Sequence, residues 1–254
     1  MELSFSIDAS VENFIDKELA WKKSKAGYFS ASKLDRLMSI SNKWTEANKD
    51  YLYEIQYERN NGILLSSPPN RNFKLGIENE AYAIEWLRAN LRTDGEIRHY
   101  DMDFEEKPFI RANFGFGASP DADIFVDGKI DAIIEIKSAV GNKERSHIFS
   151  PTLPLYKKIK WVLDSHKWQI VGQFIVFPEI TKVYLFKYDS IDSYNETDTR
   201  PADDISRGNI FCFERKVMED DIALAIQRIK FANNYLNDKL DIEKIDEYYK
   251  NLKT

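Results

Sequence analysis

Glu135 and Lys137 stand two residues apart in an apolar run that is typical of a β-strand, from Ile130 to Lys137. Because side chains alternate along a strand, the carboxylate and the ammonium group are expected on the same face. The other face of the strand is wholly apolar, with Ala132, Ile134 and Ile136. The strand therefore combines a face for packing with a face that ends in two opposite charges.

This charged pair has two interpretations from the residues alone. It can be a surface ion pair, which is common and contributes little stability. It can also be part of a metal site, with Asp121 and Glu135 as hard oxygen ligands for magnesium and Lys137 beside them. Asp121 lies in a Ser-Pro-Asp turn, and Asp127-Gly128 is a strong hairpin signal between two β-rich runs. The hairpin would bring Asp121 back toward the strand that carries Glu135.

A third carboxylate stands out on a predicted helix from about Asn72 to Leu91. Its apolar residues repeat with helical spacing, and Glu80 falls within that stripe, between Ile77 and Ile84. A carboxylate on a buried stripe is costly unless it is paired or bound to a metal. Glu80 is therefore either a metal-site residue or a glutamate that a buried arginine or the backbone satisfies.

A second helix is predicted from about Asp164 to Phe177, and most of its residues are apolar. His166, Gln169 and Gln173 form a polar stripe along it, at spacings of three and four residues. Such a stripe faces either water or a polar site.

Near the N-terminus, Lys25 precedes a predicted short helix that opens with Ser30 and Ser32. A hydroxyl-rich helix start can hold a phosphate, because backbone N–H groups converge there. The alternative is an ordinary serine cap.

The elements around these residues follow from periodicity and turn signals. Additional strands are expected at 97–104, 109–114, 181–188 and 209–217, and additional helices at 10–27, 45–61, after 217 and at 242–252. Polar loops are expected at 141–150, over the site, and at 189–207.

Composition limits the class of protein. The chain has 254 residues, 43% of them hydrophobic, which is enough for one large domain with a full core. The net charge is −6, so a polyanionic substrate needs a local basic patch. A single cysteine, Cys212, excludes a disulfide framework, an iron–sulfur cluster and a cysteine zinc site. No apolar run approaches membrane-spanning length and no leader is evident, so we expect a soluble cytoplasmic protein of a bacterial or phage-infected cell.

Taken in order, the candidate residues resemble the PD-(D/E)xK nuclease superfamily, and most of all its phage lambda exonuclease and YqaJ-type viral recombinase branch. The resemblance covers roughly Lys25 to Tyr188, and its separate stretches occur in the family's order. These stretches are Lys25-Ala-Gly27 with Ser30-Ala-Ser32, Gly76-Ile-Glu-Asn-Glu80-Ala, Ser119-Pro-Asp121, Glu135-Ile-Lys137 and His166-Lys-Trp-Gln169.

The resemblance implies an α/β fold with a restriction-endonuclease-like core. A central mixed β-sheet would be flanked by helices, with extra N-terminal and C-terminal helices. The chain would be a single nuclease domain over 1–254, with a helical subregion over about 1–70.

The resemblance also implies roles for the matching residues. Asp121, Glu135 and the Ile136 carbonyl would bind magnesium, or manganese as a substitute, with Glu80 in support. Lys137 would be the catalytic lysine and Gln169 would help to hold the site. Lys25, Ser30 and Ser32 would form the pocket for a DNA 5′-phosphate.

The implied activity is that of a metal-dependent exonuclease that degrades one strand of linear duplex DNA from 5′ to 3′ and leaves 5′-phosphate products. The implied partners are double-stranded DNA ends, a single-strand annealing protein and two further copies of the chain in a toroidal homotrimer. Two alternatives stay open: a restriction-type or repair-type endonuclease on the same core, and a non-catalytic DNA-binding assembly protein.

The sequence departs from the family pattern in places. Members often carry arginine where this chain has Lys25, and lysine lacks the bidentate fork. A second glutamine often follows the first after one residue, where this chain has Val171. The long span from Asp121 to Glu135 leaves Asp123 and Asp131 as rival ligands, ranked below Asp121.

Overall fold

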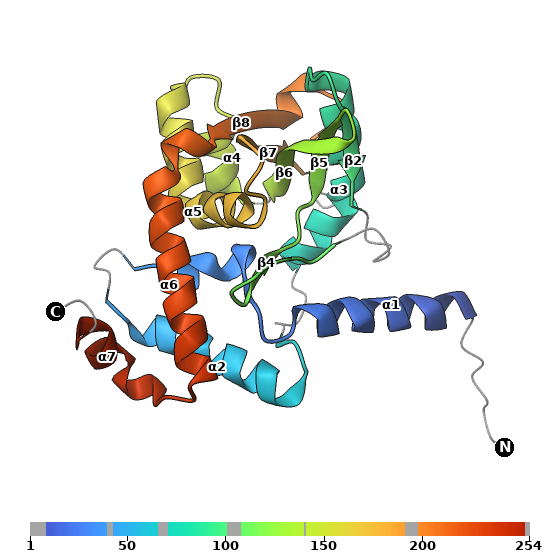
Figure 1. Ribbon diagram of the computed structural model, residues 1–254. Coiled ribbons are helices and arrows are strands. Elements are labelled where there is room, and N and C mark those ends of the chain that lie inside the picture. Colours follow the sequence, from blue (N-terminus) through green and yellow to red (C-terminus); the bar gives the residue numbers. More distant parts are fainter. Residues whose placement is uncertain are drawn as a thin grey trace.

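The computed structural model describes residues 9–39, 43–65, 71–100, 108–139, 141–190 and 198–251. A central β-sheet lies between helices, and the first helix, α1 (Ala9–Lys25), extends away from the rest of the protein (Figure 1). The predicted α/β fold, a mixed sheet flanked by helices with additional helices at both ends, is confirmed. Within the described residues, every helix is too short or too polar to span a membrane.

The central sheet has five strands in the order β2-β5-β6-β7-β8. Neighbouring strands are antiparallel except for β6 and β7, which are parallel. The predicted hairpin joins β5 to β6, and its turn residues Asp127 and Gly128 both have positive φ, 48° and 83°. This geometry suits Asp-Gly in a tight turn. The strands are β2 (Glu96–His99), β5 (Ala122–Val126), β6 (Lys129–Ala139), β7 (Lys182–Asp189) and β8 (Gly208–Glu214).

The two faces of β6 contribute to two different hydrophobic clusters. Its wholly apolar face packs against α3 (Arg71–Asn90), in a cluster that includes Ile134 and Trp86. The opposite face, with Ile133 and then Glu135, packs against α5 (Leu155–Val176). Figure 1 shows the sheet between these two helices. Glu135 therefore faces α5, and not the solvent.

A smaller sheet connects the N-terminal region to the site. Its order is β1-β4-β3, with β1 (Phe29–Ser30), β3 (Ile110–Ala112) and β4 (Phe116–Ala118). In its parallel pair, Ser30 lies opposite Gly117, just before the Ser-Pro-Asp turn. The short helix η1 (Ala31–Arg36) follows β1 and packs on α5. This sheet places the serines of the N-terminal region beside the segment that leads to Asp121.

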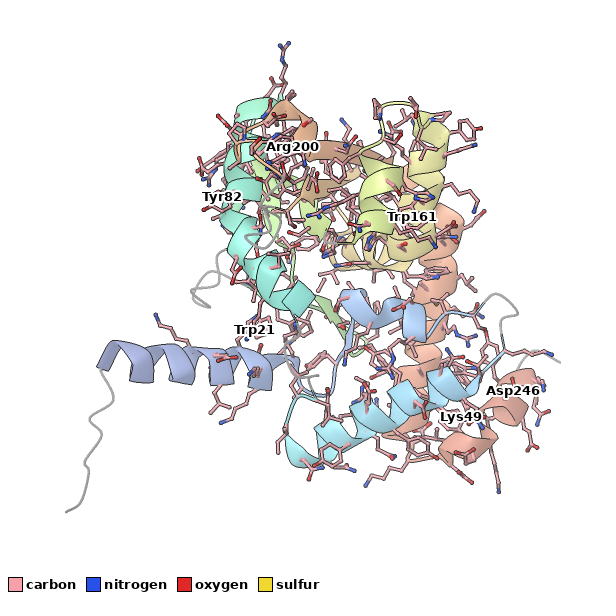
Figure 2. All side chains as sticks on the ribbon, turned by 180° about the vertical axis from the view of Figure 1, so that it is seen from behind. Trp21, Lys49, Tyr82, Trp161, Arg200 and Asp246 are labelled. Atoms are coloured by element: carbon pink, nitrogen blue, oxygen red, sulfur yellow. The ribbon has the colours of Figure 1, made fainter. Side chains whose placement is uncertain are left out.

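Helices near the C-terminus pack against the N-terminal region of the chain. Arg228 of α6 (Glu219–Asn237) is fully buried and donates to the carbonyl oxygens of Leu37 and Lys43. Lys49 of α2 (Glu46–Asn61) pairs with Glu243 at 2.9 Å, beside α7 (Ile245–Asn251). Lys49 and Asp246 are labelled on these neighbouring helices in Figure 2.

Some expected elements differ from the structure. The expected loop at 141–150 is mostly a helix, α4 (Asn142–Ile148), and the helix expected from Asp164 begins at Leu155. The strand expected at 97–104 corresponds to β2, which ends at His99, and residues 101–104 lie outside the described residues. The segment 109–114 forms only β3 before a turn leads into β4. Short helical turns interrupt the remaining connections: η2 (Ile205–Arg207), η3 (Arg215–Val217) and η4 (Ile242–Lys244).

Candidate active site

The β5–β6 hairpin brings Asp121 beside Glu135 and Lys137. Ala122 pairs with Ile134 across the hairpin, and the Asp121 Oδ2 atom accepts a hydrogen bond from the Ile136 backbone N–H at 2.9 Å. That bond fixes the aspartate next to the β6 backbone. Three residues predicted from two separate stretches therefore meet at one end of the central sheet.

The Lys137 ammonium lies between the two carboxylates. Its Nζ atom is 3.1 Å from Glu135 Oε2 and 3.7 Å from Asp121 Oδ2. Burial alone would lower the pKa of Lys137, but the attraction of Glu135 and Asp121 outweighs it and raises the pKa above its ordinary value. Lys137 is therefore an ammonium ion at neutral pH, and it neutralises part of the negative charge around it.

Glu135 is fully buried, and two residues of α5 donate hydrogen bonds to its carboxylate. Gln169 Nε2 donates to Glu135 Oε2 at 2.5 Å, and Gln173 Nε2 donates to Oε1. Burial raises the pKa of Glu135 to about 7, an effect that Lys137 opposes and that the negative charge of Asp121 strengthens. The two amides orient the carboxylate without neutralising it, so Glu135 retains a strong preference for a nearby cation.

Gln173 was not among the predicted site residues. In the family pattern a second glutamine often stands two residues after the first. This chain has Val171 at that position, and Val171 is buried in the core. Gln173 lies one helical turn after Gln169 and therefore projects from the same side of α5. The polar stripe that His166, Gln169 and Gln173 form in the sequence carried this signal, and the structure shows that the stripe faces the site.

Two buried oxygen atoms near these residues have no hydrogen-bond partner within the described part of the chain. They are the Ser119 hydroxyl, two residues before Asp121, and Gln173 Oε1. Buried polar atoms are normally hydrogen-bonded, so these two have capacity for a water molecule or a bound group.

Glu80 lies on the edge of the site, at the N-terminal half of α3. Its side chain is 15% exposed, and its Oε1 atom is 3.0 Å from His99 Nε2 at the end of β2. The negative charge of Glu80 contributes to the raised pKa of Lys137. The partner is thus a histidine, and neither of the expected alternatives, a buried arginine or the backbone. His99 was not predicted, because an isolated histidine at a strand end has no periodic signal.

The rival ligands are placed elsewhere. Asp123 is fully buried and accepts two hydrogen bonds from Arg98, at 2.9 and 2.7 Å, and one from the Tyr100 hydroxyl. A carboxylate held in this way is already compensated. Asp131 is exposed at the other end of β6 from Glu135. The lower rank of both residues agrees with their positions.

The donor set of the site fits a hard divalent cation. Asp121 and Glu135 supply oxygen atoms, and both already converge on one positive charge, that of Lys137. The described residues contain no group of three or more histidine, cysteine, aspartate or glutamate side chains placed to hold a metal. Two carboxylates with a backbone carbonyl and water suit magnesium, which usually keeps several waters.

The predicted phosphate pocket is partly assembled. Ser30 Oγ and Ser32 Oγ lie 3.3 Å apart, and the pairing of β1 with β4 places them beside the segment that leads to Asp121. Lys25 ends α1, with its ammonium 4.0 Å from the centre of the Trp21 ring and 5.7 Å from that of Phe109. The two serines are together, and the lysine lies against the aromatic rings at the end of α1.

A buried lysine, Lys187, lies next to the site. Lys187 of β7 pairs in register with Lys137, and its Nζ atom is 2.5 Å from Glu144 Oε1 of α4 and 2.8 Å from His166 Nε2 of α5. Burial, reinforced by the charges of Lys187 and Lys137, lowers the pKa of His166 to about 3. His166 is therefore neutral and accepts a hydrogen bond from Lys187. This cluster fixes α4 and α5 against the strand next to β6.

His166 should make the stability of the protein depend on pH. The unfolded chain binds a proton at this residue near pH 6.5, and the folded chain only near pH 3. Its contribution to stability is therefore present above pH 6.5 and lost as the pH falls toward 3, by up to about 1.4 kcal/mol per pH unit. We expect the unfolding free energy, measured with urea from pH 7.5 to 4.5, to fall less in His166→Gln than in wild type.

The matched control is His147→Gln, on the exposed side of α4, where the ring stacks on Trp161. It should retain the pH slope of wild type. Parallel slopes for His166→Gln and wild type would contradict the assignment of a neutral His166.

Comparison with solved structures identifies the fold. Two structures of an alkaline exonuclease (LHK-Exo) from Laribacter hongkongensis, one in complex with dAMP, match with a TM-score of 0.60 at 20% identity, over 92% of this chain and 98% of theirs. A phage-related exonuclease from Haemophilus somnus 129PT matches with a TM-score of 0.58 at 15% identity, over 84% and 96%. The chain has the fold of these exonucleases. The resemblance predicted from the sequence is confirmed at the level of the fold.

The likeness extends over almost the whole length of the exonucleases. No protein-family model matches the sequence, and neither does any curated protein. At these identities the fold is shared while most side chains differ, so the function must be argued from the site itself.

Proposed function

We propose that the protein is a metal-dependent deoxyribonuclease that degrades linear double-stranded DNA from its ends. The observation that carries this proposal is the convergence of Asp121, Glu135 and Lys137 at one end of the sheet. The shared fold supports it, because the similar structures are exonucleases. We also propose that degradation runs from 5′ to 3′ and leaves 5′-phosphates.

The residues of the site suit hydrolysis of a phosphodiester. When bound, magnesium or manganese at Asp121, Glu135 and the Ile136 carbonyl would polarise the scissile phosphate and lower the pKa of the attacking water. Gln169 and Gln173 keep the Glu135 carboxylate in one orientation. The Lys137 ammonium orients the water or stabilises the charge that develops on the phosphate. Each role requires the geometry that the hairpin and α5 impose.

Ser30, Ser32 and Lys25 are proposed to bind the 5′-phosphate of a DNA end. The serine hydroxyls lie side by side next to the strand that leads to Asp121, and a lysine supplies charge nearby. LHK-Exo was solved in complex with dAMP, a nucleoside 5′-monophosphate. Stepwise removal of single nucleotides that carry a 5′-phosphate would release a product of that class.

The test compares DNA forms in one experiment. Purified protein with magnesium is incubated with linear duplex, with and without a 5′-phosphate, and with a covalently closed circle. We expect degradation of the linear duplex, faster with a 5′-phosphate, no change in the circle, and no activity in excess chelator. Nicking or linearisation of the circle would identify an endonuclease. Binding of DNA without cleavage under all conditions would identify a non-catalytic protein.

Glu80→Gln tests the supporting carboxylate. The change keeps the shape of the side chain but removes its charge. If Glu80 supports the metal site together with His99, cleavage should fall about 10- to 100-fold. The metal-free protein should be no less stable, because one of several clustered negative charges is gone. Cleavage rates and melting temperatures, with and without magnesium, measure both effects.

Glu78→Gln is the control, two residues earlier on α3 and exposed. It should cleave at the wild-type rate. Equal cleavage and an equal magnesium-induced rise in melting temperature for Glu80→Gln and Glu78→Gln would return Glu80 to a purely structural role.

A further inference from the structure

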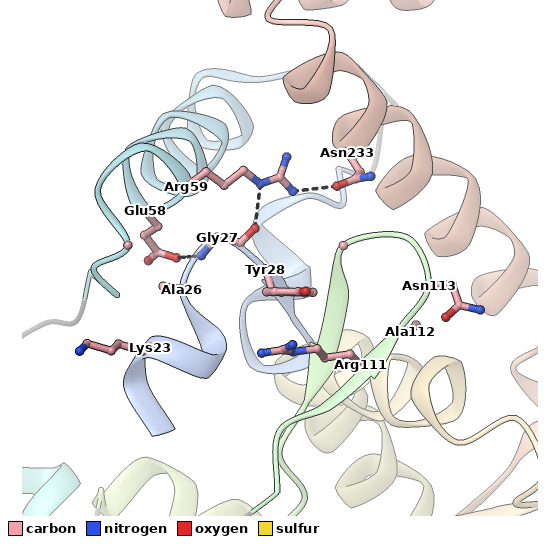
Figure 3. A pocket seen from close by; sticks show the side chains of 12 residues that line it. Lys23, Ala26, Gly27, Tyr28, Glu58, Arg59, Arg111, Ala112, Asn113 and Asn233 are labelled. Carbon is pink, nitrogen blue, oxygen red and sulfur yellow. Dashed lines mark hydrogen bonds between the residues drawn. The ribbon is translucent and has the colours of Figure 1, made fainter. Parts of the chain in front are cut away.

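A polar hollow of about 600 Å³ lies on the N-terminal side of the small sheet (Figure 3). Its walls come from the end of α1, the end of α2, the β3–β4 turn and α6. Three basic side chains line it, Lys23, Arg59 and Arg111, together with the amides of Asn113 and Asn233. The volume lies within the range of pockets for small ligands.

The two arginines of the hollow have only neutral partners among the described residues. Arg59 donates to the Gly27 carbonyl oxygen at 2.8 Å and to Asn233 Oδ1 at 2.7 Å, bonds that Figure 3 draws. Its Nη1 atom donates to Asn237 Oδ1 at 3.1 Å. Arg111 lies over the Tyr28 ring, 4.6 Å from its centre, and donates to the Ser24 carbonyl oxygen at 2.7 Å.

The basic side chains of the hollow are not paired with carboxylates of its described lining. In the described part of the chain, no carboxylate lies within ion-pair distance of Lys23, Arg59 or Arg111. Glu58 also lines the hollow, but its two oxygen atoms accept the backbone N–H groups of Gly27 and Leu65, each at 2.9 Å. The described lining of the hollow therefore carries a net positive charge, in a chain whose net charge is −6.

Two glycines keep the walls of the hollow close together. Gly27 and Gly115 both have positive φ, 78° and 73°. A Cβ atom at Gly27 would lie 2.6 Å from Arg59 Cγ, and one at Gly115 would lie 2.8 Å from Asn233 Cγ. Any other residue at either position would displace the side chains that form the basic wall. The hollow is thus a formed site whose shape depends on these two turns.

We propose that this hollow binds a phosphate group, from a DNA strand or from a free nucleotide, at a place separate from the catalytic residues. Arginine forks and side-chain amides are the donors that recognise phosphate oxygens. The hollow borders β4 at Gly115, and Asp121 follows the other end of that strand. The six residues from Gly115 to Asp121 span at most about 20 Å, which corresponds to roughly six base pairs of duplex. The lining is distinct from Lys25, Ser30 and Ser32.

The part of this inference that concerns DNA depends on the proposed nuclease function. A strand whose end is at the catalytic residues would have backbone phosphates at that distance. The hollow would then bind the duplex at a phosphate some base pairs from its end. It would not read the sequence, because phosphate contacts position DNA and carry no direct sequence information.

The first arm of the test uses labelled linear duplex in chelator, so that no cleavage occurs. Arg111→Ala and the double variant Lys23→Ala/Arg111→Ala are suitable, because Arg111 is exposed and its loss leaves the core intact. Arg111→Ala should weaken duplex binding about three- to tenfold and reduce the slope of log affinity against log salt by about 0.9. The control is Arg88→Ala, whose guanidinium is paired with Glu85 on α3; it should bind like wild type.

The second arm uses a free nucleoside 5′-monophosphate and inorganic phosphate, measured by calorimetry on the same proteins. Loss of binding only in the duplex arm would assign the site to a DNA strand, and loss only in the free-ligand arm to a nucleotide. Wild-type values for Arg111→Ala and the double variant in both arms would overturn the inference, even if the wild type cleaves DNA. If the wild type neither binds nor cleaves duplex, the nuclease proposal fails, while loss of phosphate binding in Arg111→Ala would still support the hollow as a site.

Discussion

Asp121→Asn should abolish cleavage of linear duplex, with a loss of about 10³-fold or more. The carboxylate is held by the Ile136 N–H and shares the Lys137 ammonium with Glu135. Asparagine preserves the size of the side chain but removes one of two anionic ligands, and a catalytic metal supplies several kcal/mol of transition-state stabilisation. Magnesium should also raise the melting temperature of the variant much less than that of wild type, because ligand binding stabilises the native state by mass action.

Asp123→Asn is the matched control, two residues later and within β5. Its carboxylate is engaged by Arg98 and Tyr100, so the substitution should lower stability through a broken buried ion pair. The folded fraction should still cleave DNA, and magnesium should still raise its melting temperature. If Asp123→Asn were the inactive variant and Asp121→Asn the active one, the ligand assignment would be reversed.

Lys137→Met should reduce cleavage about 10²- to 10³-fold while leaving duplex binding near the wild-type level. The ammonium group is lost, but the apolar stem and the packing of β6 remain. This loss corresponds to removing one electrostatic donor from a transition state. In chelator the variant should also be less stable, because Glu135 and Asp121 lose the cation that lies between them. Magnesium should then raise its melting temperature more than that of wild type.

Lys187→Met provides the comparison, since this buried lysine is the neighbour of Lys137 in the sheet. Its ammonium contacts Glu144 and His166, and neither carboxylate of the site. We expect reduced stability, with cleavage per folded molecule within about tenfold of wild type. A Lys137→Met variant that cleaves as well as Lys187→Met would remove Lys137 from the catalytic residues.

The predictable part of this site lies in local patterns. Alternation along β6 placed Glu135 and Lys137 on one face, and the Asp-Gly turn brought Asp121 beside them, because both effects act over a few residues. The stripe on α3 also indicated correctly that Glu80 sits on the buried side of its helix.

The unpredicted part depends on contacts between distant segments. α4 looked like a loop because most of its residues are polar, and it is held by Glu144 and Arg145 through Lys187 and Asp189, more than 40 residues away. His99 became a neighbour of Glu80 only because α3 packs against the central sheet. Periodicity in one segment contains no information about which residue another segment brings opposite it.

The parallel pairing of β6 with β7 has a consequence for the order in which the site forms. β6 ends at Ala139 and β7 begins at Lys182, and the connection between them includes both α4 and α5. The hairpin with Asp121 and Glu135 can form from nearby residues, but Gln169 and Gln173 reach Glu135 only after this long crossover has closed. Non-local pairing of this kind is slow, because loop-closure entropy is lost before its contacts form. A chain emerging from the ribosome should therefore carry an incomplete site until β7 has been synthesised and has docked, which would delay nuclease activity until most of the fold is in place.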